Sequence, residues 1–253
     1  MKLFSRVLGE GQPLLIVHGL FGMSDNWQTL AKQFAAFFEV HLIDLPNHGR
    51  SPHTDDFSYF HMCEDIIEYI SDSNLENAII IGHSLGGKLA MQLAVTEPQL
   101  ISKLIVVDIS PRFYHIHHDR IIEGLQSLEF TTLKSRSEVD KALSKYISEA
   151  DVRQFILKSM YWKEKGVLDF RFNLSSISAN IANIGEALAE DSCYEKPTLF
   201  LKGENSNYIG EHDEDLIFTH FPDANIENIA DSGHWLHAEN PTQFFETVMR
   251  FLI

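Results

Sequence analysis

The chain has 253 residues, enough for one large α/β domain with a sizeable core. Its 36 acidic and 20 basic residues give a formal net charge of −16, which disfavours binding to nucleic acid or to anionic membranes. Cys63 and Cys193 have no metal-type or C-x-x-C spacing, and the apolar run Leu14–Val17 is too short to span a membrane. We therefore expect a cytoplasmic protein without a nucleic-acid partner, membrane span or leader peptide.

Short apolar runs predict the strands of one buried, mostly parallel sheet. Several of them are apolar on both faces, which is typical of parallel sheets covered by helices on each side. Helical spacing separates most of these runs, and a closing helix is predicted at Pro241–Leu252. The predicted strands, in chain order, are Leu3–Val7, Leu14–Val17, Val40–Ile43, Ala78–Ile81, Leu104–Val107, Pro197–Leu201 and Asn225–Ile229.

The second predicted strand ends in a loop with glycines at Gly19 and Gly22. Such a loop can turn its N–H groups towards a neighbouring strand end, so we expect the Leu20 N–H to serve as an oxyanion donor. His18 lies before the loop glycine, and we interpret it as a structural residue rather than a base. Asp44, at the end of the next strand, is a possible acid, but the turn residues after it favour a structural role.

The sequence Gly82-His83-Ser84-Leu85-Gly86 connects the strand at Ala78–Ile81 to a helical pattern. This is the G-x-S-x-G motif in its expected context, a strand, a tight turn and a helix. Glycines on both sides of Ser84 are needed where a Cβ would collide with the backbone of a strained turn. We expect Ser84 to be the nucleophile and the N–H of Leu85, at the helix N-terminus, to be the second oxyanion donor.

Strand–helix alternation is interrupted between residues 112 and 191, where we expect a helical cap without strong strands. We predict a core at residues 1–111 and 192–253. The cap aromatics Tyr161, Trp162, Phe170 and Phe172 could line an acyl tunnel, but packing between helices is the simpler interpretation. His115, His117 and His118 are interpreted as solvated surface histidines rather than metal ligands. Three cations close to the site in sequence could meet a negatively charged substrate tail or could simply be solvated: Lys88, Arg112 and Arg120.

A serine of ordinary acidity needs an adjacent base, and His234, in a glycine-containing loop after the last strand, fits the chain order Ser, acid, His. The acid is less well defined. Asp108 ends the strand that neighbours the Ser84 strand, and its side chain could be fixed by the Pro111 turn. Glu204 is the alternative acid, and Ser206 could join the Asp108–His234 pair or be an ordinary turn serine. Aromatic residues expected to bind substrate are Phe21, Phe113, Tyr114, Tyr208 and Trp235.

Six segments together resemble the α/β-hydrolase superfamily and, more narrowly, the small bacterial YbfF-type esterases. They are His18–Gly22, Asn47–Ser51, Gly82–Lys88, Asp108–Pro111, Asn205-Ser206 and Gly233–Glu239. The resemblance implies an α/β-hydrolase core with an inserted helical cap and hydrolysis of carboxylic esters, acyl-CoA thioesters among them. It also implies that Asp108 is the acid and that Ser206 accompanies it.

These features predict a serine hydrolase of small-molecule acyl esters or acyl-CoA that needs neither a metal nor an organic cofactor and is a monomer or homodimer. Three alternatives stay open. The same residues could cleave carbon–carbon bonds in diketones or serve a cofactor-free haloperoxidase, and the fold could be a ligand-sensing module with an idle triad. A carboxylate nucleophile, as in epoxide hydrolases, is disfavoured because position 84 is serine.

Overall fold

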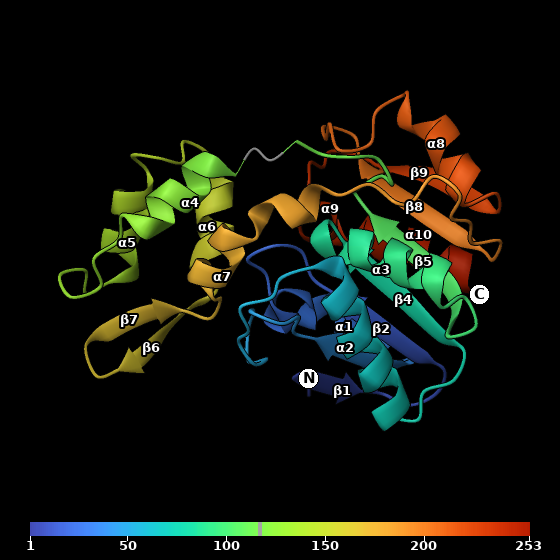
Figure 1. The fold of residues 1–253 in the computed structure, drawn as a ribbon, viewed down its shortest axis with the longest axis horizontal. Helices are drawn as coiled ribbons and strands as arrows, with labels where there is room; N and C mark the ends of the chain where they lie inside the picture. The colour runs from blue at the N-terminus through green and yellow to red at the C-terminus, as the bar shows by residue number, and fades with distance from the viewer. Residues whose placement is uncertain (116–117) are drawn as a thin grey trace.

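The structure, a computed structural model, describes residues 1–115 and 118–253. Within these ranges, seven strands form one sheet in the order β1-β3-β2-β4-β5-β8-β9 (Figure 1). Only β1 among them runs antiparallel to its neighbour, so the mostly parallel sheet expected from the sequence is confirmed. The strands are β1 (Ser5–Leu8), β2 (Pro13–Val17), β3 (Glu39–Ile43), β4 (Ala78–His83), β5 (Ile101–Val107), β8 (Thr198–Gly203) and β9 (Ala224–Ile229).

Helices cover both faces of this sheet because alternate strand residues point to opposite sides. In β2, for example, Leu15 and Val17 belong to one apolar cluster, and Leu14 and Ile16 belong to the other. The first cluster includes side chains of α2 (Tyr59–Asp72), α3 (Leu85–Thr96) and α8 (Asp213–His220). The second includes side chains of α1 (Gln28–Phe34) and α10 (Pro241–Leu252), with the short η1 (Ser24–Trp27) and α9 (Leu236–Glu239) nearby in sequence.

The elements between β5 and β8 lie mainly beyond one end of the sheet (Figure 1). They are α4 (Asp119–Gln126), α5 (Arg136–Leu143), α6 (Ala150–Leu157), β6 (Met160–Glu164), β7 (Val167–Phe170), α7 (Leu174–Ala179) and η2 (Ile181–Gly185). We keep the name cap segment for residues 112–191. The cap segment packs on the first apolar cluster through residues such as Ile156, Leu168 and Ile177.

The cap segment is not wholly helical, so the expectation that it lacks strands is wrong. β6 and β7 form an antiparallel hairpin in which Met160 pairs with Phe170 and Trp162 with Leu168. Gly166 turns the chain between them at φ +81°, a conformation that favours glycine. The hairpin escapes a search for buried strands because β6 is largely solvent-exposed and has no apolar run. No helix in the described ranges combines the length and the apolar character that crossing a bilayer requires.

Candidate active site

Ser84 lies at the carboxyl end of β4, in a tight turn that requires a glycine on each side of it. Its own backbone has φ 53° and ψ −116°, a strained conformation for a residue with a side chain. A Cβ on Gly82 would lie 2.2 Å from the Gly86 carbonyl oxygen, and one on Gly86 would lie 2.5 Å from that of Val17. The two glycines therefore let α3 begin directly against the strand ends, which places Ser84 at the carboxyl end of the central strand.

The loop after β2 runs close against Ser84. A Cβ on Gly19 would lie 2.8 Å from His83 Nδ1 and 3.2 Å from Ser84 Cβ. Within the described residues, no protein acceptor takes the N–H of Leu20 or the N–H of Leu85. Both residues line a small cavity next to Ser84, so their N–H groups are available for a ligand oxygen at that position.

Two buried histidines hold this loop. His18 Nδ1–H donates to the Gly19 carbonyl over 2.8 Å, and its Nε2 accepts the Leu45 N–H over 3.1 Å. His48 Nε2 accepts the Phe21 N–H over 3.1 Å while its Nδ1–H donates to the Pro46 carbonyl. Burial lowers the pKa of His18 to about 4 and that of His48 to about 3, which keeps both rings neutral. His18 is thus a structural residue, as the sequence suggested.

Asp44 is structural as well. Its carboxylate oxygens accept the backbone N–H groups of Ser24 and Arg50 over 2.5 and 2.8 Å. A Cβ on Gly49, whose φ is +57°, would overlap this carboxylate. Asp44 therefore fixes the turn after β3 rather than contacting the residues around Ser84.

The carboxylate that contacts the His234 ring belongs to Asp108. His234 Nδ1 lies 2.7 Å from Asp108 Oδ2, and the Asp108 side chain is fully buried. The Gly203 N–H donates to Oδ1 over 3.2 Å, and the Ser206 hydroxyl donates to Oδ2 over 2.5 Å. Asp108 is therefore positioned by the end of β8, not by the Pro111 turn that the sequence suggested. Glu204, the alternative acid, is exposed and accepts the Asp231 N–H over 2.8 Å.

His234 is also held by two neighbours that the sequence did not reveal as partners. The Tyr208 ring stacks on the imidazole with centroids 3.9 Å apart and an angle of 17°. His83 Nε2–H donates to the backbone carbonyl of His234 over 2.8 Å, which ties the loop that carries His234 to the residue before Ser84. Burial holds the pKa of His83 well below its usual range, so this ring stays neutral and keeps its single donor.

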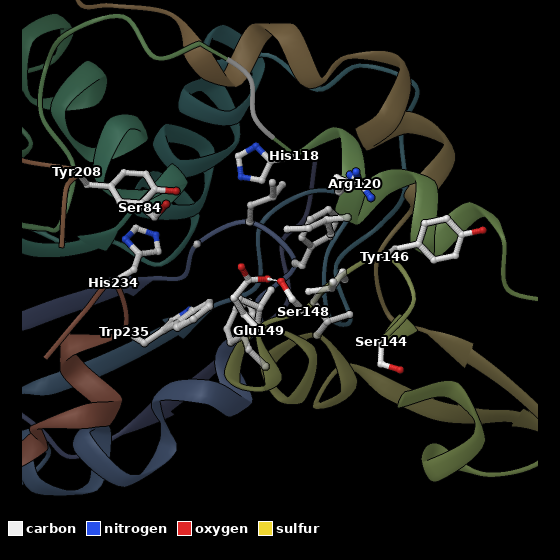
Figure 2. A pocket seen from close by; sticks show the side chains of 18 of the residues that line it. Ser84, His118, Arg120, Ser144, Tyr146, Ser148, Glu149, Tyr208, His234 and Trp235 are labelled. Atoms are coloured by element: carbon white, nitrogen blue, oxygen red, sulfur yellow. Dashed lines mark hydrogen bonds between the residues drawn. The ribbon is translucent and has the colours of Figure 1, made fainter. Parts of the chain in front are cut away.

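Ser84 and His234 line the same cavity of about 740 Å³, which opens towards the cap segment (Figure 2). Three of the five aromatic residues expected to bind substrate, Phe21, Tyr208 and Trp235, line it. Tyr114 lines the smaller cavity next to Ser84. Phe113 is absent from both linings and is 51% exposed, so the structure does not bring it to the site with the other four.

The far wall of the large cavity comes from the cap segment. α6 contributes Val152, Phe155 and Ile156, and Phe155 packs on Trp235 with ring centroids 5.1 Å apart. Figure 2 shows polar groups of the cap segment on the same cavity, among them Ser148 and Glu149. No sequence pattern indicates this wall, because the face of α6 that meets the core depends on how the cap segment packs against the rest of the chain.

The other residues of interest near the site have mainly structural contacts. Phe170 and Phe172 stack with centroids 4.7 Å apart and are buried, in agreement with a packing role. Lys88 is buried and donates to the Arg112 carbonyl over 2.6 Å, and its pKa is lowered to about 7 by burial. The Arg112 side chain pairs with Asp213 over 3.0 Å. Of the three cations, Arg120 is the one that lines the larger cavity.

The three cap histidines do not behave alike. His115 is exposed and lines the smaller cavity alone, whereas His118 is half-buried and lines both cavities next to Ser84, so the interpretation of His118 as a solvated surface residue is wrong. His117 lies outside the described residues. Among the residues described, no group of three or more His, Cys, Asp or Glu side chains is arranged to hold a metal ion.

A buried histidine under the site makes folding sensitive to acid. His237 stacks on Trp27 with centroids 4.0 Å apart, and burial lowers its pKa to about 3. Between about pH 6.5, where an unfolded histidine titrates, and about pH 3, the unfolded chain binds the extra proton. As the pH is lowered through this window, the free energy of unfolding therefore decreases, by about 1.4 kcal/mol per pH unit for this one group.

His237→Phe should remove this contribution while keeping an aromatic ring against Trp27. Urea titrations at about pH 7.5 and about pH 5 give the free energy of unfolding at each pH. Between these two pH values, we expect the variant to lose about 2 kcal/mol less unfolding free energy than the parent. The exposed His212, changed to Gln, serves as the matched control and should leave the parental difference unchanged. An identical pH dependence in the Phe variant and the parent would contradict the buried, neutral state of His237.

With this geometry established, the chain can be compared with known proteins. Residues 12–241 match the family model described as "alpha/beta hydrolase fold". A putative esterase/lipase of Haemophilus influenzae is 39% identical over 94% of this chain and 82% of its own. Esterase YbfF of Escherichia coli is 32% identical over 96% of this chain and 94% of its own. Among solved structures, a marine microorganism esterase is 44% identical, covers 99% of both chains and superposes with a TM-score of 0.96.

The chain therefore belongs to the α/β-hydrolase family. Within that family it is an esterase-type enzyme that resembles YbfF, as its sequence motifs suggested.

Proposed function

We propose that the chain hydrolyses short- to medium-chain carboxylic esters, with acyl-CoA thioesters as a second substrate class, through a Ser84–His234–Asp108 triad. The observation that carries the proposal is the 2.7 Å contact between His234 and the buried Asp108, on a histidine that shares a cavity wall with Ser84. A buried carboxylate on Nδ1 fixes the tautomer whose Nε2 can accept a proton from a serine hydroxyl.

In the proposed mechanism, Ser84 Oγ attacks the ester carbonyl carbon while His234 Nε2 takes the hydroxyl proton. The carbonyl oxygen becomes an oxyanion that accepts the N–H groups of Leu20 and Leu85. The bond to the leaving oxygen then breaks, and His234 returns the proton to that oxygen, which leaves an acyl group on Ser84. Water activated by His234 attacks the acyl carbon and releases the acid and the free serine. This sequence uses groups of the chain and water alone.

Ser206 is proposed as a fourth member of this arrangement. Its hydroxyl donates to Asp108 over 2.5 Å and accepts the Tyr208 N–H over 3.2 Å. A hydrogen bond to a buried carboxylate stabilises its charged form and limits its rotation. Ser206 therefore acts through Asp108 as a positioning residue. The small-molecule ester is the partner we expect, and a cytoplasmic monomer or homodimer stays a prediction.

Labelling with a fluorophosphonate probe tests whether the serine is activated, which distinguishes an enzyme from a ligand-sensing module with an idle triad. The probe forms a bond to a serine oxygen only when a base removes the proton. We expect stoichiometric labelling of the parent chain at Ser84, located by peptide mass spectrometry. His234→Gln should lose it, and the exposed His212→Gln control should retain it. Equal labelling of the His234 variant would refute the assigned base.

A further inference from the structure

Two cavities of very different size meet at Ser84. The larger has a volume of about 740 Å³ and the smaller about 40 Å³. Leu20, Ser84, His118 and Tyr208 line both, so these residues form the boundary between them. An ester bound at Ser84 has two halves, the acyl group and the alcohol, and each half must extend into one of these spaces.

The position of the base decides which half enters which cavity. In the proposed mechanism, His234 gives its proton to the leaving oxygen, so the alcohol half has to start on the His234 side. His234 and its neighbour Trp235 line the larger cavity and are absent from the lining of the smaller one. The alcohol therefore faces the larger cavity. The acyl group faces the smaller cavity, whose lining includes both Leu20 and Leu85.

One part of the smaller cavity's wall, formed by Tyr59, Tyr114 and η2, is held by hydrogen bonds, and His115 and His118 also line the cavity. The Tyr59 hydroxyl donates to the Ile184 carbonyl over 2.9 Å, and the Tyr114 N–H donates to the Gly185 carbonyl over 2.8 Å. These bonds tie η2 to both tyrosine-bearing segments, and Tyr59 and Tyr114 are themselves buried. η2 therefore cannot move away from this cavity without breaking these two hydrogen bonds. The cavity's volume of about 40 Å³, against about 740 Å³ for the larger cavity, admits only the smaller half of an ester.

We propose that the enzyme selects esters of short acids, of about the size of acetate, with bulky alcohols or thiols. The inference rests on the proposed function, because it uses the route of the proton through His234. The larger cavity supports the second half of the proposal. Trp235 and Phe155 give it an apolar surface, and Arg120 and Glu149 give it polar groups (Figure 2).

Two isomeric esters test this orientation with the unmodified protein. Hexyl acetate and methyl heptanoate have the same atoms, but the long chain is on the alcohol in one and on the acid in the other. We expect kcat/KM, followed by acid release in a pH-stat, to be at least about 10-fold higher for hexyl acetate, the scale of a misfit in an apolar pocket. Equal rates, or faster hydrolysis of methyl heptanoate, would overturn the inference and leave the proposed function intact. Failure to hydrolyse either ester would overturn the proposed function and the inference with it.

A change in the small cavity tests which residues set the limit. Ile184→Ala should enlarge the cavity and raise kcat/KM for hexyl hexanoate, relative to hexyl acetate, by about 10-fold. Ile181→Ala is the matched control, because Ile181 lies in the same η2, is partly buried and lines neither cavity. An unchanged ratio in the Ile184 variant, with hexyl acetate still hydrolysed, would overturn the assignment of the small cavity to the acyl group.

Discussion

Ser84→Ala is expected to lower kcat for nitrophenyl ester hydrolysis by at least about 10³-fold, the scale seen when the nucleophile of such a triad is deleted. The expected loss is large because the strained turn between Gly82 and Gly86 presents one hydroxyl at the cavity wall, and water cannot take its place in a covalent step. The N–H groups of Leu20 and Leu85 would still bind the ester oxygen, so KM should change far less than kcat.

The exposed Ser137 on α5 provides a matched control, because Ser137→Ala makes the same chemical change away from both cavities. It should keep the parental rate. Thermal unfolding of both variants should stay close to that of the parent, which separates a loss of chemistry from a loss of fold. A Ser84→Ala variant that turned over the ester at a near-parental rate would end the assignment of Ser84 as nucleophile.

Asp108→Asn is the second change with a large expected effect, a fall in kcat of about 10⁴-fold. The amide NH₂ would face His234 Nδ1, which favours the tautomer with its proton on Nε2, so the imidazole could no longer accept the Ser84 proton. The same amide has no negative charge to stabilise the imidazolium that forms during the reaction. The Gly203 N–H would still donate to the amide oxygen, and the Ser206 oxygen would accept from the NH₂ group instead of donating, so the fold should be preserved.

Glu204→Gln tests the competing acid in the same assay. Its carboxylate is exposed and accepts the Asp231 N–H, a contact that an amide oxygen can also make. We therefore expect less than about a 2-fold change in kcat, in line with surface substitutions away from the reacting groups. If Glu204→Gln lost as much activity as Asp108→Asn, the acid would have to be reassigned despite the 2.7 Å contact with His234.

The local sequence determined the strands, the tight turn around Ser84 and the strand ends at which the functional residues lie. Apolar runs defined the buried parallel strands, because a strand covered on both faces needs apolar residues at every position. The glycines around Ser84 defined the turn, because a Cβ there would meet backbone atoms at less than 3 Å. These are short-range effects, and a pattern in the chain can therefore reveal them.

Only the tertiary structure decided which groups meet. The contact of His234 with Asp108 rather than Glu204 depends on where the parallel strands β5 and β8 end. The contact of His83 with the His234 carbonyl joins residues 151 positions apart. The sequence also did not show which side chains of the cap segment face the larger cavity. Phe155 and His118 line it, whereas Phe113 is exposed. Helical spacing shows that a helix has an apolar face, but the direction of that face depends on packing against distant residues, which no local pattern records.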